Sequence, residues 1–263
     1  GWSLKDIINS EDPEIIKKTN IAQPYIFSVS YCYGIEAINN LGKPAALIGH
    51  SLGEYTALCL SGYLDYKDAL KVIAVRGEEM HKAVENSNTT MAAVLTGDLE
   101  TTIEEIEKLN NQGIQIWISN FNDPSQIVIS SYIDDMNYLK SNPKALGAKR
   151  VIPLEVAGAF HTEIVSSAKK PLEDTLNSID ISEGKIPVYM NVDAKKVEAS
   201  TLKENLVNQI DNSVLFNQQI EFVNNDIDPD LWCHIGPGNV TAGMVRKSIS
   251  YKDLKVINSL ESS

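Results

Sequence analysis

Residues 46–54 read Ala-Leu-Ile-Gly-His-Ser-Leu-Gly-Glu, and this stretch decides the fold of the chain. The apolar residues before Gly49 predict a buried strand, and the apolar spacing after Gly53 predicts a helix. A Gly-x-Ser-x-Gly motif between a strand and a helix is typical of a nucleophile elbow, a sharp turn that exposes its serine. We expect both glycines to be required, because side chains there would clash with the strand and the helix. The motif makes Ser51 the candidate nucleophile and the N–H of Leu52, at the helix N-terminus, a candidate oxyanion donor.

The alternative for this stretch is a plain strand–helix turn in which Ser51 only caps the helix. A serine hydroxyl needs a general base to act as a nucleophile at neutral pH, so the four histidines are informative. His161 is the strongest candidate, because it follows Gly-Ala-Phe at 158–160 in a predicted loop and opens a predicted helix. The other three, including His50 within the elbow, are expected to be structural or solvated. No Asp or Glu is placed as a third member, so a Ser-His dyad is predicted, with a backbone carbonyl orienting the imidazole.

The composition narrows the class of protein. The length of 263 residues allows one large domain, or one domain with a smaller one inserted. No apolar run reaches the roughly 18 residues of a membrane span. The formal net charge of −12 disfavours nucleic acid as a partner. Three widely spaced cysteines argue against both a disulfide framework and a metal site. We therefore expect a reducing, cytoplasmic compartment, with an organellar one also open.

The pattern of the chain changes near residue 88. From there to residue 155, short apolar runs and one amphipathic segment predict the order β-α-β-β-α-β, the ferredoxin-like split unit. Helical and strand-like segments alternate again after it. We predict an α/β fold in which residues 1–87 and 156–263 form one discontinuous domain and residues 88–155 an inserted small subdomain.

Several motifs occur in a fixed order along the chain. They are Gly-His-Ser-Leu-Gly-Glu at 49–54, Arg-Gly at 76–77, Asn-Phe-Asn-x-Pro-x-Gln at 120–126, Gly-Ala-Phe-His at 158–161 and Gly-Pro-Gly at 236–238. Together they closely resemble the malonyl-CoA:acyl-carrier-protein acyltransferases of fatty-acid and polyketide synthesis, and the resemblance covers essentially the whole chain. It implies an α/β-hydrolase-like core with a parallel sheet and a ferredoxin-like subdomain.

The resemblance assigns chemical roles to single residues. It implies that Ser51 is acylated by a thioester and that His161 is the base and then the acid for the leaving thiol. Leu52 would supply an oxyanion N–H. The family glutamine whose backbone carbonyl orients the histidine falls at Gln209, although a helical glutamine is otherwise often solvated.

The resemblance also implies a substrate-binding set. Arg76 would pair with the free carboxylate of the malonyl group, and Phe160 beside the base goes with malonyl rather than methylmalonyl. Asn120 and His50 are further substrate-binding candidates. From the residues alone, Arg76 has the alternative of a surface ion pair with neighbouring glutamates, and Asn120 that of turn hydrogen bonds.

The predicted function is therefore ping-pong transfer of malonyl from malonyl-CoA, a coenzyme A thioester, to the phosphopantetheine thiol of an acyl carrier protein. Malonyl-CoA enters as substrate, no cofactor or metal is expected, and the chain is a monomer or a domain of a larger synthase. Two alternatives stay open: an acyl-carrier-protein thioester hydrolase, whose relatives typically lack the arginine, and a non-catalytic carrier-protein-binding module. The family's N-terminal strand and Gly-Gln-Gly-Ser-Gln loop have no counterpart in residues 1–45, so we expect the chain to lack that first segment.

Overall fold

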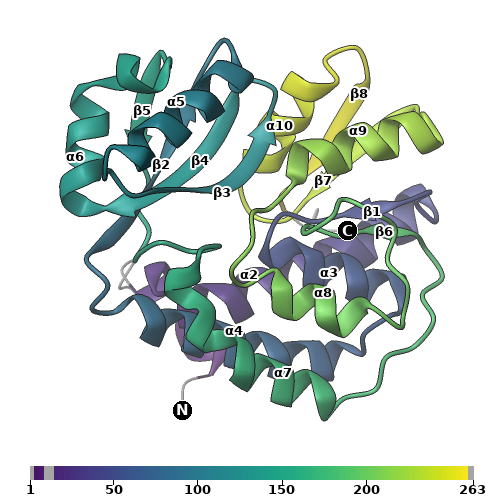
Figure 1. Cartoon of the computed structure of the whole chain (residues 1–263). Helices are drawn as coiled ribbons and strands as arrows, with labels where there is room; N and C mark the ends of the chain where they lie inside the picture. Colours follow the sequence, from purple (N-terminus) through teal and green to yellow (C-terminus); the bar gives the residue numbers. More distant parts are fainter. Residues whose placement is uncertain (1–2, 9–14, 260–263) are drawn as a thin grey trace.

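The computed structural model describes residues 3–8 and 15–259 (Figure 1). Its α-helices are α1 (Leu4–Ile8), α2 (Thr19–Leu41), α3 (Leu52–Ser61), α4 (Tyr66–Val84), α5 (Leu99–Asn111), α6 (Ile133–Ser141), α7 (Lys169–Asn177), α8 (Leu202–Asn208), α9 (Phe216–Ile227) and α10 (Val240–Ser248). Its strands are β1 (Leu47–Ile48), β2 (Thr89–Leu95), β3 (Ile116–Asp123), β4 (Gln126–Tyr132), β5 (Arg150–Pro153), β6 (Val188–Tyr189), β7 (Leu231–Ile235) and β8 (Asp253–Ile257). Short 3-10 helices lie at Ile15–Lys17, Pro143–Leu146 and Glu163–Ala168.

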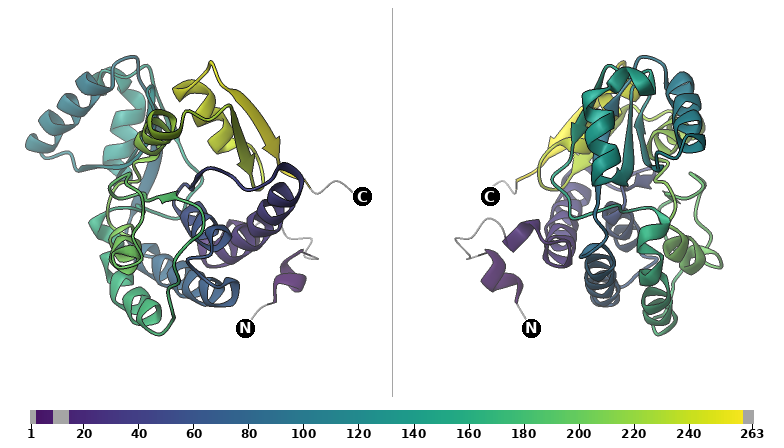
Figure 2. Two further views of the ribbon diagram at one scale, coloured as in Figure 1. Left: turned by 90° about the vertical axis from the view of Figure 1, so that its right-hand side faces the viewer. Right: turned by 60° about the vertical axis from the view of Figure 1, so that its left-hand side comes forward.

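A layer of helices forms the base of the molecule, and it contains α2, α3, α4, α7 and α8 (Figure 1). The largest apolar cluster lies between these helices and includes Phe27, Leu58, Ile73 and Leu172, none of which is exposed. The helix α4 begins where Asp65 accepts hydrogen bonds from the first backbone N–H groups, which satisfies donors that a helix start leaves open. Two smaller units lie above this layer, one with the sheet of β2 to β5 and one with the β7–β8 pair (Figure 2).

The first of these units contains β2 to β5, with α5 and α6. Its sheet has the strand order β3-β4-β2-β5, and every pairing is antiparallel. In β4, Ile127 and Ile129 share an apolar cluster with Ile106 of α5 and Leu139 of α6. Because alternate residues of a strand face the same side, both helices pack on one face of the sheet. The elements follow the predicted β-α-β-β-α-β order.

The parallel strands form two separate pairs, β1 with β6 and β7 with β8. The chain is therefore an α/β mixture with parallel and antiparallel sheets. Leu47 lies opposite Val188 and Ile48 opposite Tyr189, so β1 and β6 end at the same edge. The loops that follow these two strands consequently begin side by side, and they build the site described below. Among the described residues, no helix has the length and apolar character needed to cross a bilayer.

Candidate active site

The turn between β1 and α3 is strained at its serine. Ser51 has φ 50° and ψ −104°, a backbone conformation that side-chain-bearing residues rarely adopt and that costs about 1–3 kcal/mol. A Cβ on Gly49 would lie 2.0 Å from the carbonyl carbon of Gly53, so position 49 must be glycine. A Cβ on Gly53 would meet nothing within 4 Å. The expectation that both glycines are required is thus wrong for Gly53, because its outward side faces open space.

The side chain of Asn191 stabilises this turn through two hydrogen bonds. It is fully buried and lies in the loop after β6. Its Oδ1 accepts a hydrogen bond from the Ser51 N–H at 2.7 Å, and its Nδ2 donates to the carbonyl of Gly49 at 2.6 Å. One side chain therefore ties both sides of the strained residue, which compensates part of the backbone strain.

Ser51 and His161 meet although 110 residues separate them along the chain. The Oγ of Ser51 lies 2.8 Å from Nε2 of His161. The Nδ1 of His161 lies 2.8 Å from the carbonyl oxygen of Gln209, the residue that caps the C-terminus of α8. A carbonyl can only accept, so Nδ1 carries the proton and Nε2 offers a lone pair to the Ser51 hydroxyl. His161 has a positive φ of 59°, and the helix after it starts as a 3-10 turn at Glu163.

Burial gives this histidine the protonation state of a base. It lowers the pKa of His161 to about 3, and the positive charge of Arg76 acts in the same direction. The imidazole is therefore neutral at pH 7 and able to accept a proton.

Arg76 reaches the same serine from α4. Its side chain is almost completely buried, and Nη2 donates to Ser51 Oγ at 3.0 Å and to Gln209 Oε1 at 2.8 Å. Nη1 donates to Gln23 Oε1 at 2.5 Å, whereas Nε finds no hydrogen-bond partner among the described residues. These acceptors are all neutral. Burial lowers the pKa of Arg76, but a guanidinium stays protonated in proteins, so the positive charge is available to an anionic group. The alternative of a surface ion pair with the neighbouring glutamates is wrong.

The remaining predicted residues lie around this centre. Phe160, Asn120 and His50 line the same cavity. His50 places Nε2 2.9 Å from Oδ1 of Asn122, and burial lowers its pKa. Leu52 is the first residue of α3, a position whose N–H has no partner within a helix.

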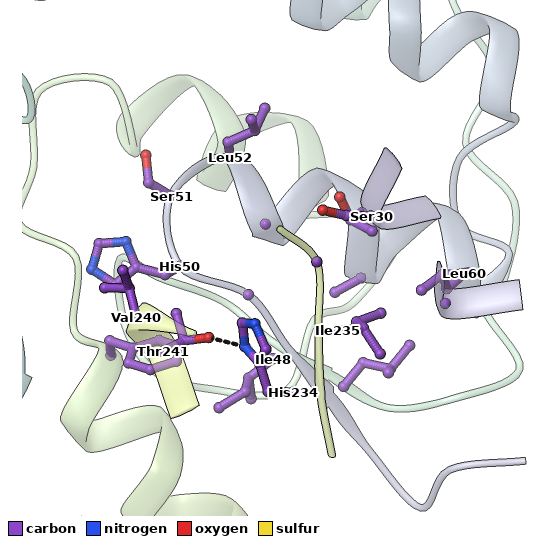
Figure 3. A pocket seen from close by; sticks show the side chains of 18 of the residues that line it. Ser30, Ile48, His50, Ser51, Leu52, Leu60, His234, Ile235, Val240 and Thr241 are labelled. Atoms are coloured by element: carbon purple, nitrogen blue, oxygen red, sulfur yellow. Dashed lines mark hydrogen bonds between the residues drawn. The ribbon is translucent and has the colours of Figure 1, made fainter. Parts of the chain in front are cut away.

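The cavity has a volume of about 730 Å³. Ser51, Arg76 and His161 all line it. Most of the other lining side chains are apolar, and α2, β1, α3 and β7 all contribute to them. Figure 3 shows Ser51 and His50 on one side of the cavity and Leu60 and Ile235 on the other. His234 also lines it, with Nδ1 2.6 Å from Oγ1 of Thr241 (Figure 3). Within the described part of the chain, no group of three or more His, Cys, Asp or Glu could hold a metal ion.

Comparison with known proteins places this geometry in a family. The model of the acyl transferase domain family matches residues 1–260. The chain belongs to this family. This acyltransferase is 36% identical over 246 residues to the malonyl CoA-acyl carrier protein transacylase of Bacillus subtilis, covering 93% of the chain and 77% of that relative. It is 33% identical over 261 residues to the Staphylococcus aureus (strain MRSA252) protein of the same name, covering 99% and 84%.

Solved structures agree with the sequence relatives. A complex described as a type II PKS acyl-carrier protein with its malonyl-transacylase aligns with a TM-score of 0.90 and 29% identity, covering 99% of this chain and 84% of that one. A crystal structure described as MCAT from Streptococcus pneumoniae aligns with a TM-score of 0.89 and 31% identity, and the alignment again covers 99% of this chain and 84% of that one. The predicted relationship to malonyl-CoA:acyl-carrier-protein acyltransferases is therefore confirmed.

The sequence predicts no site role for three residues of the acyltransferase site: Gln23, Glu54 and Asn191. Each is a buried polar residue that contacts the elbow, Arg76 or Gln209 through its side chain. The available signal was weak. Asn191 follows the apolar residues at 188–190, and Glu54 is the only charged residue between 51 and 61.

Proposed function

We propose that this acyltransferase moves a malonyl group from malonyl-CoA to the phosphopantetheine thiol of an acyl carrier protein, through an acyl-Ser51 intermediate. One observation carries the proposal: the Ser51 Oγ lies 2.8 Å from a neutral imidazole and 3.0 Å from a buried guanidinium. A base and a cation thus both contact the oxygen that would act as the nucleophile. The names of the relatives, malonyl CoA-acyl carrier protein transacylases, support the same substrate and acceptor.

The first half-reaction follows from the hydrogen bonds. His161 takes the hydroxyl proton on Nε2 as Ser51 Oγ attacks the thioester carbonyl. The N–H of Leu52, at the positive end of α3, stabilises the oxyanion. When the carbon–sulfur bond breaks, His161 returns the proton to the leaving sulfur, and Ser51 keeps the acyl group as an ester. The Gln209 carbonyl accepts from Nδ1 throughout, so Nε2 is the nitrogen that takes up and returns the proton.

The second half-reaction runs the same steps with another thiol. The carrier-protein thiol gives its proton to His161 and attacks the Ser51 ester. Collapse of this intermediate returns the proton to Ser51 Oγ and releases the malonyl thioester of the carrier protein. This ping-pong order needs one site for two thiols in turn, which the single Ser51–His161 pair provides.

Arg76 is the residue that selects malonyl over acyl groups without a carboxylate. A guanidinium recognises a carboxylate through paired N–H groups, and among the described residues the acceptors bonded to Arg76 are neutral, which leaves its fork available to a substrate carboxylate. Phe160, Asn120 and His50 complete the substrate-binding surface, because they line the cavity beside it.

The proposal includes the domain arrangement predicted from the sequence. Residues 1–87 and 156–263 form an α/β-hydrolase-like catalytic domain, supported by the elbow between β1 and α3. Residues 88–155 form a ferredoxin-like subdomain, supported by the strand order β3-β4-β2-β5 with both helices on one face. The cytoplasmic location and the state as a monomer or a synthase domain remain predictions.

Mass spectrometry of the protein mixed with malonyl-CoA tests the proposal. We expect a malonyl adduct on the peptide that contains Ser51, absent in Ser51→Ala and discharged when a phosphopantetheinylated carrier protein is added. An adduct that survives Ser51→Ala contradicts the proposal. Rapid release of free malonate without a carrier protein would favour the hydrolase, and carrier-protein binding without any adduct would favour the binding module.

A further inference from the structure

Glu54 is a carboxyl group buried directly behind the site. It lies in the first turn of α3, three residues after Ser51, and none of its surface is exposed. A glutamate three residues after a capping serine usually turns back to the serine N–H in a capping box. Here the Ser51 N–H donates to Asn191 instead, and the Glu54 side chain points into the protein. Because burying a carboxyl group is costly, its partners show what it does.

Both oxygens of Glu54 accept hydrogen bonds from the machinery around Ser51. Oε1 accepts from the backbone N–H of Asn191, and Oε2 accepts from Nε2 of Gln209, each at 2.5 Å. Burial raises the pKa of Glu54 to about 8, while these two donors and the charge of Arg76 oppose the rise because each stabilises the ionised form. Where Glu54 is ionised, above about pH 8, its carboxylate can only accept, so the side-chain NH₂ of Gln209 must face it.

The orientation of Gln209 decides what Arg76 meets. The Gln209 Nε2 faces more than one acceptor, because it donates to Glu54 and also to the carbonyl of Ser51, the latter at 3.0 Å. Its Oε1 therefore faces the other way and accepts from Arg76 Nη2 at 2.8 Å. A Gln209 amide turned by half a rotation would place NH₂ against the guanidinium and a carbonyl against the carbonyl of Ser51. The hydrogen-bonded link from Glu54 to Arg76 thus runs through Gln209, beside the direct attraction between their charges.

We propose that Glu54 is a positioning residue for acyl selectivity: it fixes the Gln209 amide so that the Arg76 fork is held in place to receive the substrate carboxylate. The inference rests on the proposed function and adds a specificity-determining residue to it. Since Gln209 orients His161 through its backbone carbonyl and Arg76 through its side chain, the effect of Glu54 is directed at Arg76.

The variant Glu54→Gln tests this with almost no change in shape. Its amide brings an NH₂ against either the Asn191 N–H or the Gln209 NH₂, and turning Gln209 over relieves the second clash. Above pH 8, where Glu54 is ionised in the wild type, we expect the ratio of malonyl to acetyl loading on Ser51 to fall about tenfold. Acetyl loading and labelling by a fluorophosphonate, which carries no carboxylate, are expected to stay within about threefold.

Two further variants separate an effect on the malonyl-to-acetyl loading ratio from a general effect on folding. Ser61→Ala removes a buried hydrogen bond on the same helix, from Oγ to the carbonyl of Leu58 at 2.8 Å, and is expected to leave the ratio unchanged. The exchange Glu54→Gln with Gln209→Glu restores an amide–carboxylate pair between these positions if the single variant fails to fold. It is still expected to lose malonyl preference, because the carboxylate at position 209 now occupies Arg76.

The results of these experiments distinguish failure of the proposed function from failure of the inference about Glu54. A wild-type protein that never acylates Ser51 overturns the proposed function and, with it, this inference. A wild type that prefers malonyl beside a Glu54→Gln variant with the same preference overturns the inference alone. Equal losses of malonyl loading, acetyl loading and fluorophosphonate labelling also overturn it, because they indicate a purely structural role. A preserved ratio in the exchange variant counts against it equally.

Discussion

The sharpest consequence of the site concerns Arg76→Ala. In the wild type, a malonyl carboxylate gains charge-assisted hydrogen bonds from the guanidinium, worth about 1.5–3 kcal/mol each. To make them, Arg76 gives up its 3.0 Å hydrogen bond to the Ser51 Oγ. The loss of this bond costs about 1 kcal/mol. Two new bonds at the lower to middle values minus this loss leave about 3 kcal/mol. At about 1.4 kcal/mol per tenfold change, malonyl selectivity should fall roughly 10²-fold.

The assay is the rate of acyl-Ser51 formation, measured by quenched mass spectrometry with malonyl-CoA and acetyl-CoA in parallel. We expect the loss almost entirely in the malonyl rate. Arg76→Lys keeps the charge without the fork and should recover part of the selectivity. Arg246→Ala, at an exposed arginine of α10, is the matched control and should change neither rate. Equal losses for malonyl and acetyl, or an unchanged ratio, would refute the assignment of Arg76 to the substrate carboxylate.

Three further predictions concern the base and the elbow. Because the pKa of His161 is lowered to about 3, the folded base stays neutral below its ordinary value of 6.5, so fluorophosphonate labelling of Ser51 should be constant from pH 8 down to about 5. A loss of labelling with a midpoint near 6.5 would contradict this. Asn191→Ala removes two buried hydrogen bonds to the elbow and should lower the free energy of unfolding by about 2–4 kcal/mol in urea titrations, while labelling slows. An unchanged urea midpoint would show that the elbow does not need them. Gly49→Ala should prevent folding or cost more than about 3 kcal/mol, whereas Gly53→Ala should leave the melting temperature equal or higher; similar melting temperatures for both would contradict the clash.

Local sequence was sufficient for much of the fold. The strand, elbow and helix around Ser51 and the alternation of elements between residues 88 and 155 could be predicted because period and turn residues are local properties. The elbow prediction failed in one detail, the need for glycine at position 53. Which of two glycines is crowded depends on the direction of the helix that follows, and the motif does not encode that direction.

The environment of Arg76 could not be predicted from its neighbours. It stands on a helix beside Glu78 and Glu79, where a solvated ion pair is the default. Packing of α4 against α2 instead turns it inward, where Gln23 of α2 accepts from it. Burial is set by contacts between helices that are distant along the chain, so only the assembled layer decides it.

By itself, the sequence predicted the candidate nucleophile, the pattern of helices and strands and the family of this protein, because these depend on residue types at short or fixed spacings. Only the tertiary structure decided that Asn191, Gln209 and Glu54 surround the elbow as one hydrogen-bonded group. Such a group is assembled by parallel strands that end at one edge and by a helix end that supplies an unpaired carbonyl. Those are properties of the packed chain, and no local pattern carries them.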